Sequence, residues 1–135
     1  MKKVFVDANL FMRYFTQDDK GQHERAVRLF QQAVEGHVEL VCGPPVLFEV
    51  AWTLRSAYKL PREKVGETLA AILALPGLHL NDAHLVEAAL RRSAQARVEF
   101  ADAYIAVSAE SLGAEEIATF NEADFRRLGA RLFRL

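Results

Sequence analysis

Short apolar segments alternate with longer segments of helical periodicity along this chain, and this alternation constrains the fold more than any other feature of the sequence. The strand candidates are Lys3–Val6, Leu40–Cys42, Leu78–Leu80, Glu116–Thr119 and Arg131–Leu135. The helix candidates are Leu10–Tyr14, Gln22–Val34, Pro44–Tyr58, Pro61–Leu75, Asp82–Ala96, Ala101–Leu112 and Glu122–Leu128. Parallel strands need long crossover connections, which are usually helices, so the alternation predicts an α/β fold. We expect three layers, with a central, mainly parallel sheet of about four to five strands flanked by about seven helices.

The length and charge of the chain limit its organisation and its partners. A chain of 135 residues fits one domain, so we expect residues 1–135 to form a single domain. Hydrophobic residues make up 51% and charged residues 26%, which excludes a disordered or fibrous protein. The formal net charge of -1 is unlike the strongly basic balance of a general nucleic-acid binder. Any contact with nucleic acid must therefore come from a local patch.

The cysteine content and the apolar run lengths bear on where the protein resides. The one cysteine, Cys42, excludes an internal disulfide and a cysteine-rich zinc site, which is typical of a reducing compartment. The longest uncharged stretch, Thr68–Asn81, has 14 residues and contains Pro76, whereas a membrane helix needs about 20. We therefore expect a soluble, cytoplasmic protein that makes no membrane contact.

Four acidic residues occupy positions that fit either a ligand-binding role or an ordinary structural role. Asp7 follows the first strand, at the edge where open parallel sheets bind ligands, but it is equally placed to cap a helix. Glu49 lies in a helix that is apolar nearly all round, so it is either buried without a cation or part of a narrow solvent-facing stripe. Asp102 repeats this pattern, with a first-turn acid favoured by the helix dipole as the alternative. Asp124 alone is typical of a surface acid.

Carboxylates that converge in one cleft repel each other unless a cation lies between them. Ligand sets made only of oxygen suit hard cations such as Mg²⁺ or Mn²⁺. These ions polarise phosphoryl oxygens and activate water for attack. If the four acids converge, the chemistry that they indicate is metal-dependent hydrolysis of a phosphodiester.

Four segments in order along almost the whole chain are similar to the motifs of one protein family. They are Val4–Phe11, Leu47–Val50, Phe100–Ala106 and Thr119–Phe125. The chain resembles the PIN-domain family and, within it, the VapC-type toxins of toxin–antitoxin pairs. The resemblance implies a PIN-like fold and a Mg²⁺- or Mn²⁺-dependent endoribonuclease, which hydrolyses RNA phosphodiester bonds with a water activated by the metal.

The resemblance also implies roles for the acidic residues. Asp7, Glu49 and Asp102 match the acids of the family that hold the metal and carry out catalysis. Asp124 is the candidate for the fourth catalytic and metal-binding position. Many members have aspartate where this chain has Asn121, so either Asn121 or Asp124 fills that position, and the number of metal ions stays open.

Supporting and RNA-contacting residues follow from the same resemblance and from local charge. Asn9 and Thr119 are expected to position the ligands or the phosphate. Arg13, Arg126 and Arg127 are basic residues near the candidate acids or at the C-terminal end, and they are weak candidates for phosphate contacts.

The resemblance also implies binding partners, and two other functions fit parts of the sequence. The family implies an RNA substrate of the tRNA or rRNA class, a cognate VapB-like antitoxin and a homodimer. One alternative, prompted by Asn121, is a catalytically degenerate PIN-like module that binds protein or RNA. Another is a phosphohydrolase of the haloacid dehalogenase type, but that family needs a second aspartate where this chain has Asn9.

Overall fold

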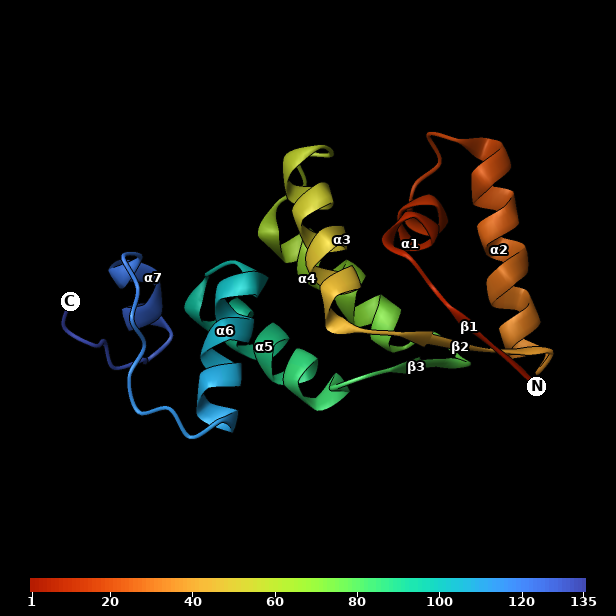
Figure 1. The fold of residues 1–135 in the computed structure, drawn as a ribbon. Coiled ribbons are helices and arrows are strands. Elements are labelled where there is room, and N and C mark those ends of the chain that lie inside the picture. The colour runs from red at the N-terminus through yellow and green to blue at the C-terminus, as the bar shows by residue number, and fades with distance from the viewer. The chain divides into compact units, whose positions relative to one another are not determined.

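The computed structural model describes all residues from Met1 to Leu135, and it contains seven helices and one three-stranded sheet. The chain divides into two compact units, Met1–Ala83 and His84–Leu135, which are described one at a time. Figure 1 shows the order of the elements along the chain.

The sheet belongs to the first unit and is entirely parallel. Its order is β1-β2-β3, and its strands are β1 (Lys2–Phe5), β2 (Val38–Cys42) and β3 (Leu78–Leu80). β2 is central, and its Leu40 lies opposite Val4 on one side and Leu78 on the other. Leu40 is completely buried, as expected for the middle of a parallel sheet.

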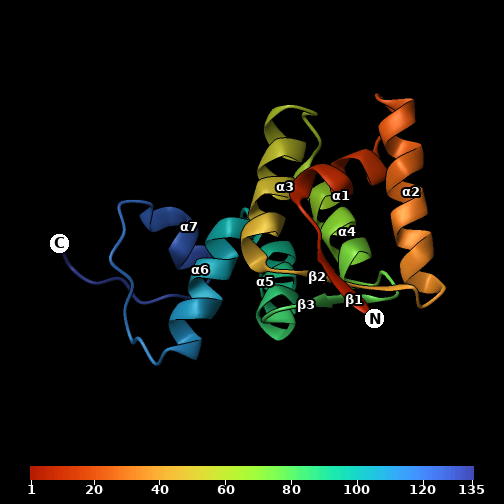
Figure 2. The ribbon, with the colours of Figure 1, turned by 45° about the vertical axis from the view of Figure 1, so that its right-hand side comes forward.

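Four helices of the first unit connect and cover these strands. They are α1 (Ala8–Phe15), α2 (Lys20–Val34), α3 (Pro44–Ser56) and α4 (Arg62–Leu73). α1 packs against α2 and α3, and α3 packs against α4. Both ribbon views show α1, α2 and α3 on one side of the strands (Figures 1 and 2). The largest fully buried side chains of the four helices are Phe11, Leu47, Leu54, Leu69 and Ile72.

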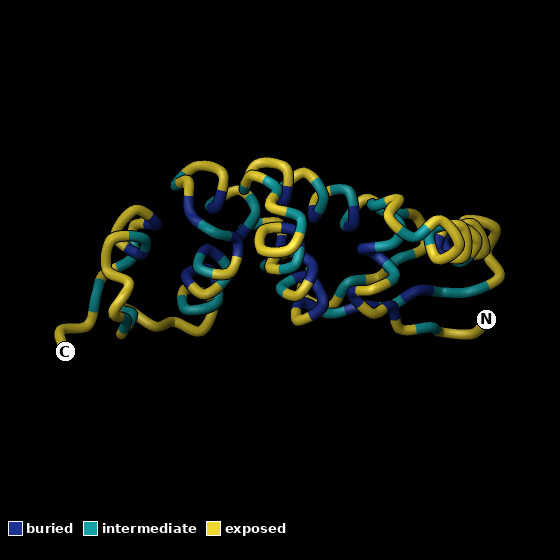
Figure 3. The backbone as a smooth tube through the Cα atoms, turned by 90° about the horizontal axis from the view of Figure 1, so that it is seen from above, coloured by how far each residue is buried: buried dark blue, intermediate teal, exposed yellow.

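The second unit is helical. Its helices are α5 (Ala83–Ala96), α6 (Phe100–Ser111) and α7 (Glu122–Arg127), and α6 packs against α7. The buried Ser93 hydroxyl donates to the Val98 carbonyl at 2.6 Å and so closes the turn between α5 and α6. The segment between α6 and α7 is mostly exposed, as Figure 3 shows by its colour.

The α/β class, the parallel sheet and the seven helices confirm the prediction, but the expected four to five strands are wrong. Segments 116–119 and 131–135 form only one isolated parallel bridge, between Ile117 and Leu132. It consists of the Ile117 N–H donating to the Arg131 carbonyl and the Phe133 N–H donating to the Ile117 carbonyl. Ile117 and Leu132 are only half-buried among exposed neighbours, so little apolar surface supports a longer ladder.

None of the helices combines the length and the apolar character that crossing a membrane requires.

Candidate functional site

Asp7 is fixed by the start of α1. It follows β1 and occupies the N-cap position, where its Oδ1 accepts a hydrogen bond from the Ala8 N–H at 2.8 Å. The Asn9 amide Nδ2 donates to the other carboxylate oxygen at 3.5 Å. The structure thus confirms that Asp7 caps the helix. Its position after the first strand leaves its exposed carboxylate available for a second role.

Glu49 lies on the exposed side of α3. The buried residues of this helix are Pro44, Val46, Leu47, Val50 and Leu54, and Glu49 falls outside the side that they form. Glu49 itself is exposed, and no cationic side chain pairs with it. Of the two interpretations of this residue, the narrow solvent-facing stripe is therefore correct and a buried carboxylate is wrong. The apolar composition of the helix gave no sign of this exposed stripe, because apolar Pro45 and Trp52 share it with Glu49.

In the second unit, Asn121 joins two of the candidate acids. Asp102 lies in the first turn of α6, and Asp124 lies in the first turn of α7. The Asn121 amide Nδ2 donates to Asp102 Oδ2 at 3.4 Å and to Asp124 Oδ2 at 3.1 Å. The Thr119 hydroxyl oxygen accepts a hydrogen bond from the Asn121 backbone N–H at 2.9 Å. This bond restrains Asn121, which contacts both acids. Four residues singled out from the sequence therefore lie together in this unit.

The electrostatics around Asp102 disfavour its charged form. Partial burial raises the pKa of Asp102 above its usual value, and the negative charges of Asp124 and Glu99 raise it further. The Arg127 guanidinium lies 3.7 Å from Asp124 Oδ1, on the other carboxylate oxygen from the one that Asn121 contacts. Glu99 stands three residues before Asp102, so the sequence already indicates an acidic neighbour at helical spacing.

These donors fit a hard divalent cation in kind. Carboxylate and amide oxygens are the ligands that Mg²⁺ and Mn²⁺ prefer, and a nearby positive charge offsets the repulsion between Asp102 and Asp124. Within neither unit do three His, Cys, Asp or Glu side chains gather closely enough to hold a metal ion. The acids of one unit alone therefore supply only part of a coordination shell, and Mg²⁺ characteristically fills remaining positions with water.

The three candidate arginines all have acidic partners. Arg13 Nη1 lies 2.9 Å from Asp18 Oδ1, and Arg13 Nε donates to Gln22 Oε1 at 2.7 Å. Arg126 pairs with Glu122 one helical turn away, at 2.8 Å. Arg127 lies beside Asp124, so it is the one of the three that adjoins a candidate metal ligand.

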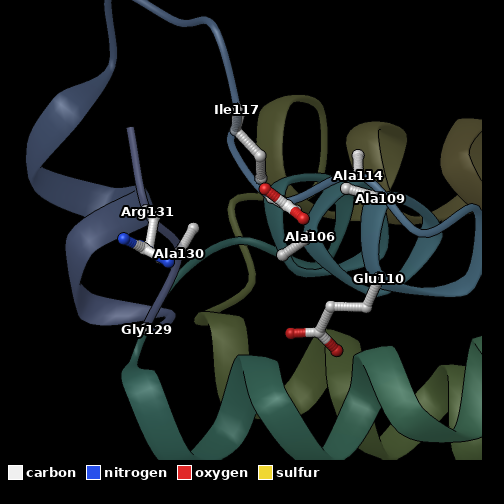
Figure 4. Close-up of a pocket in the computed structure, with 9 residues that line it drawn as sticks. Ala106, Ala109, Glu110, Ala114, Ile117, Gly129, Ala130 and Arg131 are labelled. Atoms are coloured by element: carbon white, nitrogen blue, oxygen red, sulfur yellow. The ribbon is translucent and has the colours of Figure 1, made fainter. Parts of the chain in front are cut away.

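One small pocket of the second unit lies away from these residues. Its volume is about 140 Å³, and Figure 4 shows it between the C-terminal half of α6 and the segment around Gly129. Four of its nine lining residues are alanines, and Glu110, one of its two acids, pairs with Arg92 at 2.9 Å. None of the candidate acids lines this pocket, so it is not the site indicated by the sequence.

The family model described as PIN domain matches residues 4–131. No curated protein matches the chain. The matched range includes Asp7, Glu49, Asp102 and Asp124, and PIN domains are generally metal-dependent nucleases. Since the match extends over nearly the whole chain, this protein belongs to the PIN domain family.

Proposed function

We propose that this protein is a Mg²⁺- or Mn²⁺-dependent endoribonuclease and the toxin component of a VapBC-type toxin–antitoxin pair. The observation that carries the proposal is the arrangement of Asp102 and Asp124 around the Asn121 amide, in a chain that belongs to the PIN domain family. Two acids that lie close together, one of them with a raised pKa, are the arrangement expected of residues that bind a cation.

The proposal treats residues 1–135 as one PIN domain. The family match supports this because it runs without interruption through both compact units. It assigns the acids of both units, Asp7 and Glu49 from the first and Asp102 and Asp124 from the second, to one reaction.

Each of the four candidate acids has a role in this proposed reaction. Asp7, Glu49, Asp102 and Asp124 serve as metal ligands and thus as the catalytic acids. A bound Mg²⁺ or Mn²⁺ supplies charge that polarises a phosphoryl oxygen and lowers the pKa of water. The capping bond from the Ala8 N–H restricts the Asp7 side chain and so limits the entropy lost when Asp7 takes up a ligand.

The polar neighbours orient these acids. Asn121 holds Asp102 and Asp124 with one oxygen of each aimed at its amide, and Thr119 fixes the Asn121 backbone. Asn9 contacts the second oxygen of Asp7. In the proposal Asp124 is the fourth acidic ligand, and Asn121 acts as a positioning residue.

RNA cleavage by the purified protein tests the proposal. We expect cleavage of tRNA or rRNA that needs Mn²⁺ or Mg²⁺ and stops in EDTA. Asp102→Asn and Asp7→Asn should abolish cleavage while circular dichroism shows an intact fold. Glu87→Gln is the matched control because Glu87 is an exposed acid of α5 with no assigned role. Full activity of both aspartate variants, or activity that EDTA leaves unchanged, would contradict the proposal.

A degenerate module that binds protein or RNA without cleaving it is the second candidate. The observation that favours it is Asn121, a neutral residue where many PIN domains have an acid. Calorimetric titration with Mn²⁺ separates the two candidates. Binding that disappears in Asp102→Asn supports the nuclease, and absence of binding at millimolar Mn²⁺ supports the module.

The partners in this proposal are a VapB-like antitoxin and a second copy of the chain, and the RNA is of the tRNA or rRNA class. Arg127, beside Asp124, is the best placed of the candidate arginines for a phosphate, ahead of Arg13 and Arg126. Size-exclusion chromatography with light scattering tests the homodimer, which predicts twice the mass of the 15.2 kDa chain.

A further inference from the structure

Three aromatic side chains of the first unit are candidates for stacking on nucleic-acid bases, and the structure separates them. Tyr14 packs against Phe15 and Phe30, with ring centroids 5.0 and 4.7 Å away. The Tyr58 hydroxyl donates to Asp18 at 2.6 Å. Trp52, in contrast, is 71% exposed. An exposed tryptophan keeps a large apolar surface in water, so a ligand that covers it gains free energy.

Trp52 lies on the same side of α3 as Glu49. The two residues are three positions apart, and side chains with this spacing are neighbours on a helix, with Cβ atoms about 5–6 Å apart. The buried residues Val46, Val50 and Leu54 hold the opposite side of α3 against its own unit. The packing of α3 therefore turns Glu49 and Trp52 outward together.

The surroundings of Trp52 favour a polar partner over an apolar protein surface. Of the α3 residues one turn away from Trp52, Glu49, Arg55 and Ser56 are polar and exposed, and Phe48 is the apolar one. A docking site for an apolar helix needs a continuous patch of several hundred Å². A single flat ring among polar side chains matches a nucleobase, which offers a π-face of similar size beside a charged backbone.

We propose that Trp52 stacks on a base of the RNA substrate, adjacent to the phosphate that is cut. The proposal rests on the proposed function, because it places the substrate on the side of α3 that carries the acidic ligand Glu49. Trp52 is then a substrate-binding residue. It holds a neighbouring nucleotide and so keeps the scissile phosphate beside the acids.

Stacking predicts a loss of affinity of a definite size. A base stacked on an aromatic side chain contributes about 1–3 kcal/mol by alanine substitution, which is about a 5- to 150-fold change in affinity. Trp52→Ala should therefore raise KM for RNA by such a factor and change kcat much less. Trp52→Phe keeps a ring and should recover most of the affinity.

Tryptophan fluorescence tests the contact directly because Trp52 is the one tryptophan of the chain. The probe is a single-stranded RNA hexamer, added to the full chain carrying Asp102→Asn so that the RNA stays intact. We expect the hexamer to quench the Trp52 emission. A hexamer of abasic ribose phosphates, which has the same charges without bases, should bind more weakly and leave the emission unchanged.

Affinity measurements with labelled RNA supply the second readout and its control. Anisotropy should show weaker binding for Trp52→Ala, near wild-type binding for Trp52→Phe, and unchanged binding for Val34→Ala, which truncates another exposed apolar residue of the first unit. RNA binding without quenching, or Trp52→Ala affinity within twofold of wild type, would overturn the proposal. So would emission that changes with protein concentration alone, because a second copy would then cover Trp52.

The outcomes also separate this inference from the proposed function. If the wild-type protein cleaves RNA and Trp52→Ala cleaves it with the same KM, only the stacking role fails. If the wild-type protein cleaves no RNA, the nuclease proposal fails, and the quenching experiment still decides whether Trp52 contacts bases.

Discussion

The candidate acids of the two units differ in what accounts for them. In the first unit, Asp7 caps α1 and Glu49 belongs to an exposed stripe of α3, so ordinary local structure explains both without a ligand. In the second unit, Asp102 lies beside Asp124 and its pKa is raised by burial and by neighbouring negative charge. The Asn121 amide contacts both acids and Arg127 pairs with Asp124, and the pKa of Asp102 is raised even so. The second unit therefore gives the stronger physical argument for a cation.

The largest expected effect that tests this comparison is stabilisation by metal. A ligand that binds only the folded state at 100 times its Kd adds about 2.7 kcal/mol to the free energy of unfolding. We expect Mn²⁺ to stabilise the wild-type protein by this amount in urea denaturation and to have almost no effect on Asp102→Asn. Glu87→Gln, the matched control, should respond like wild type. Equal stabilisation of Asp102→Asn would break the comparison.

A smaller effect isolates the structural role of Asp7. In EDTA, Asp7→Ala should lower the free energy of unfolding by about 1 kcal/mol because it removes the N-cap of α1. Asp7→Asn should cost close to nothing, since asparagine caps helices as well as aspartate does. Asp102→Ala should not destabilise the metal-free protein through its charge, because its charged form is disfavoured. Equal losses for Asp7→Asn and Asp7→Ala would contradict the capping role.

Much of the fold was accessible from sequence because its signals are local. The run of strand and helix candidates matches the observed order from β1 to α7, with the three strands of the sheet and its two crossover connections in place. Apolar periodicity marked the buried side of α2. The outcome for segments 116–119 and 131–135 was not accessible, because pairing between distant segments depends on packing that no local pattern encodes.

The candidate site shows the same division. The contact between Asn121 and Asp124 is local, since side chains three residues apart at the start of a helix are neighbours. The contact of Asn121 with Asp102, 19 residues earlier, is a tertiary fact that no spacing predicts. Composition misled at Glu49, because it is the one polar residue between Pro44 and Trp52, a pattern typical of a buried helix, and yet it lies on an exposed side of α3.

The pH dependence of stability sharpens the comparison further. Because the pKa of Asp102 is raised in the folded state, its contribution to stability is present below the usual value of 3.8 and is lost as pH rises through the raised pKa. In EDTA, wild-type protein should therefore lose stability over that window relative to Asp102→Asn. Free energies of unfolding from urea titrations at successive pH values measure the difference. Parallel pH profiles for the two proteins would contradict this contribution of Asp102 to the free energy of unfolding.

The smallest effect concerns an acid of the first unit whose partners the chain does supply. The pKa of Asp18 is lowered from 3.8 to about 2, chiefly by the Tyr58 hydroxyl, with Thr16 and Arg13 adding to this. Its contribution to stability is thus present above about pH 4 and is lost as pH falls toward 2. Tyr58→Phe removes the main donor, so the pKa of Asp18 should move back toward 3.8.

Carboxyl carbon chemical shifts, followed by NMR against pH, measure this pKa directly. Tyr14→Phe is the matched control, since the Tyr14 ring packs against Phe15 and Phe30 and its removed hydroxyl lies outside the Asp18 bonds. Asp18 and Asp102 are the two extremes of the comparison. Hydrogen-bond donors from the chain lower the pKa of Asp18, whereas burial and acidic neighbours raise the pKa of Asp102. If Tyr58→Phe leaves the titration of Asp18 unchanged, the hydrogen bond from the Tyr58 hydroxyl does not lower the pKa of Asp18, and the physical causes assigned to both pKa shifts lose their support. The case for a cation at Asp102 then has to rest on metal binding alone.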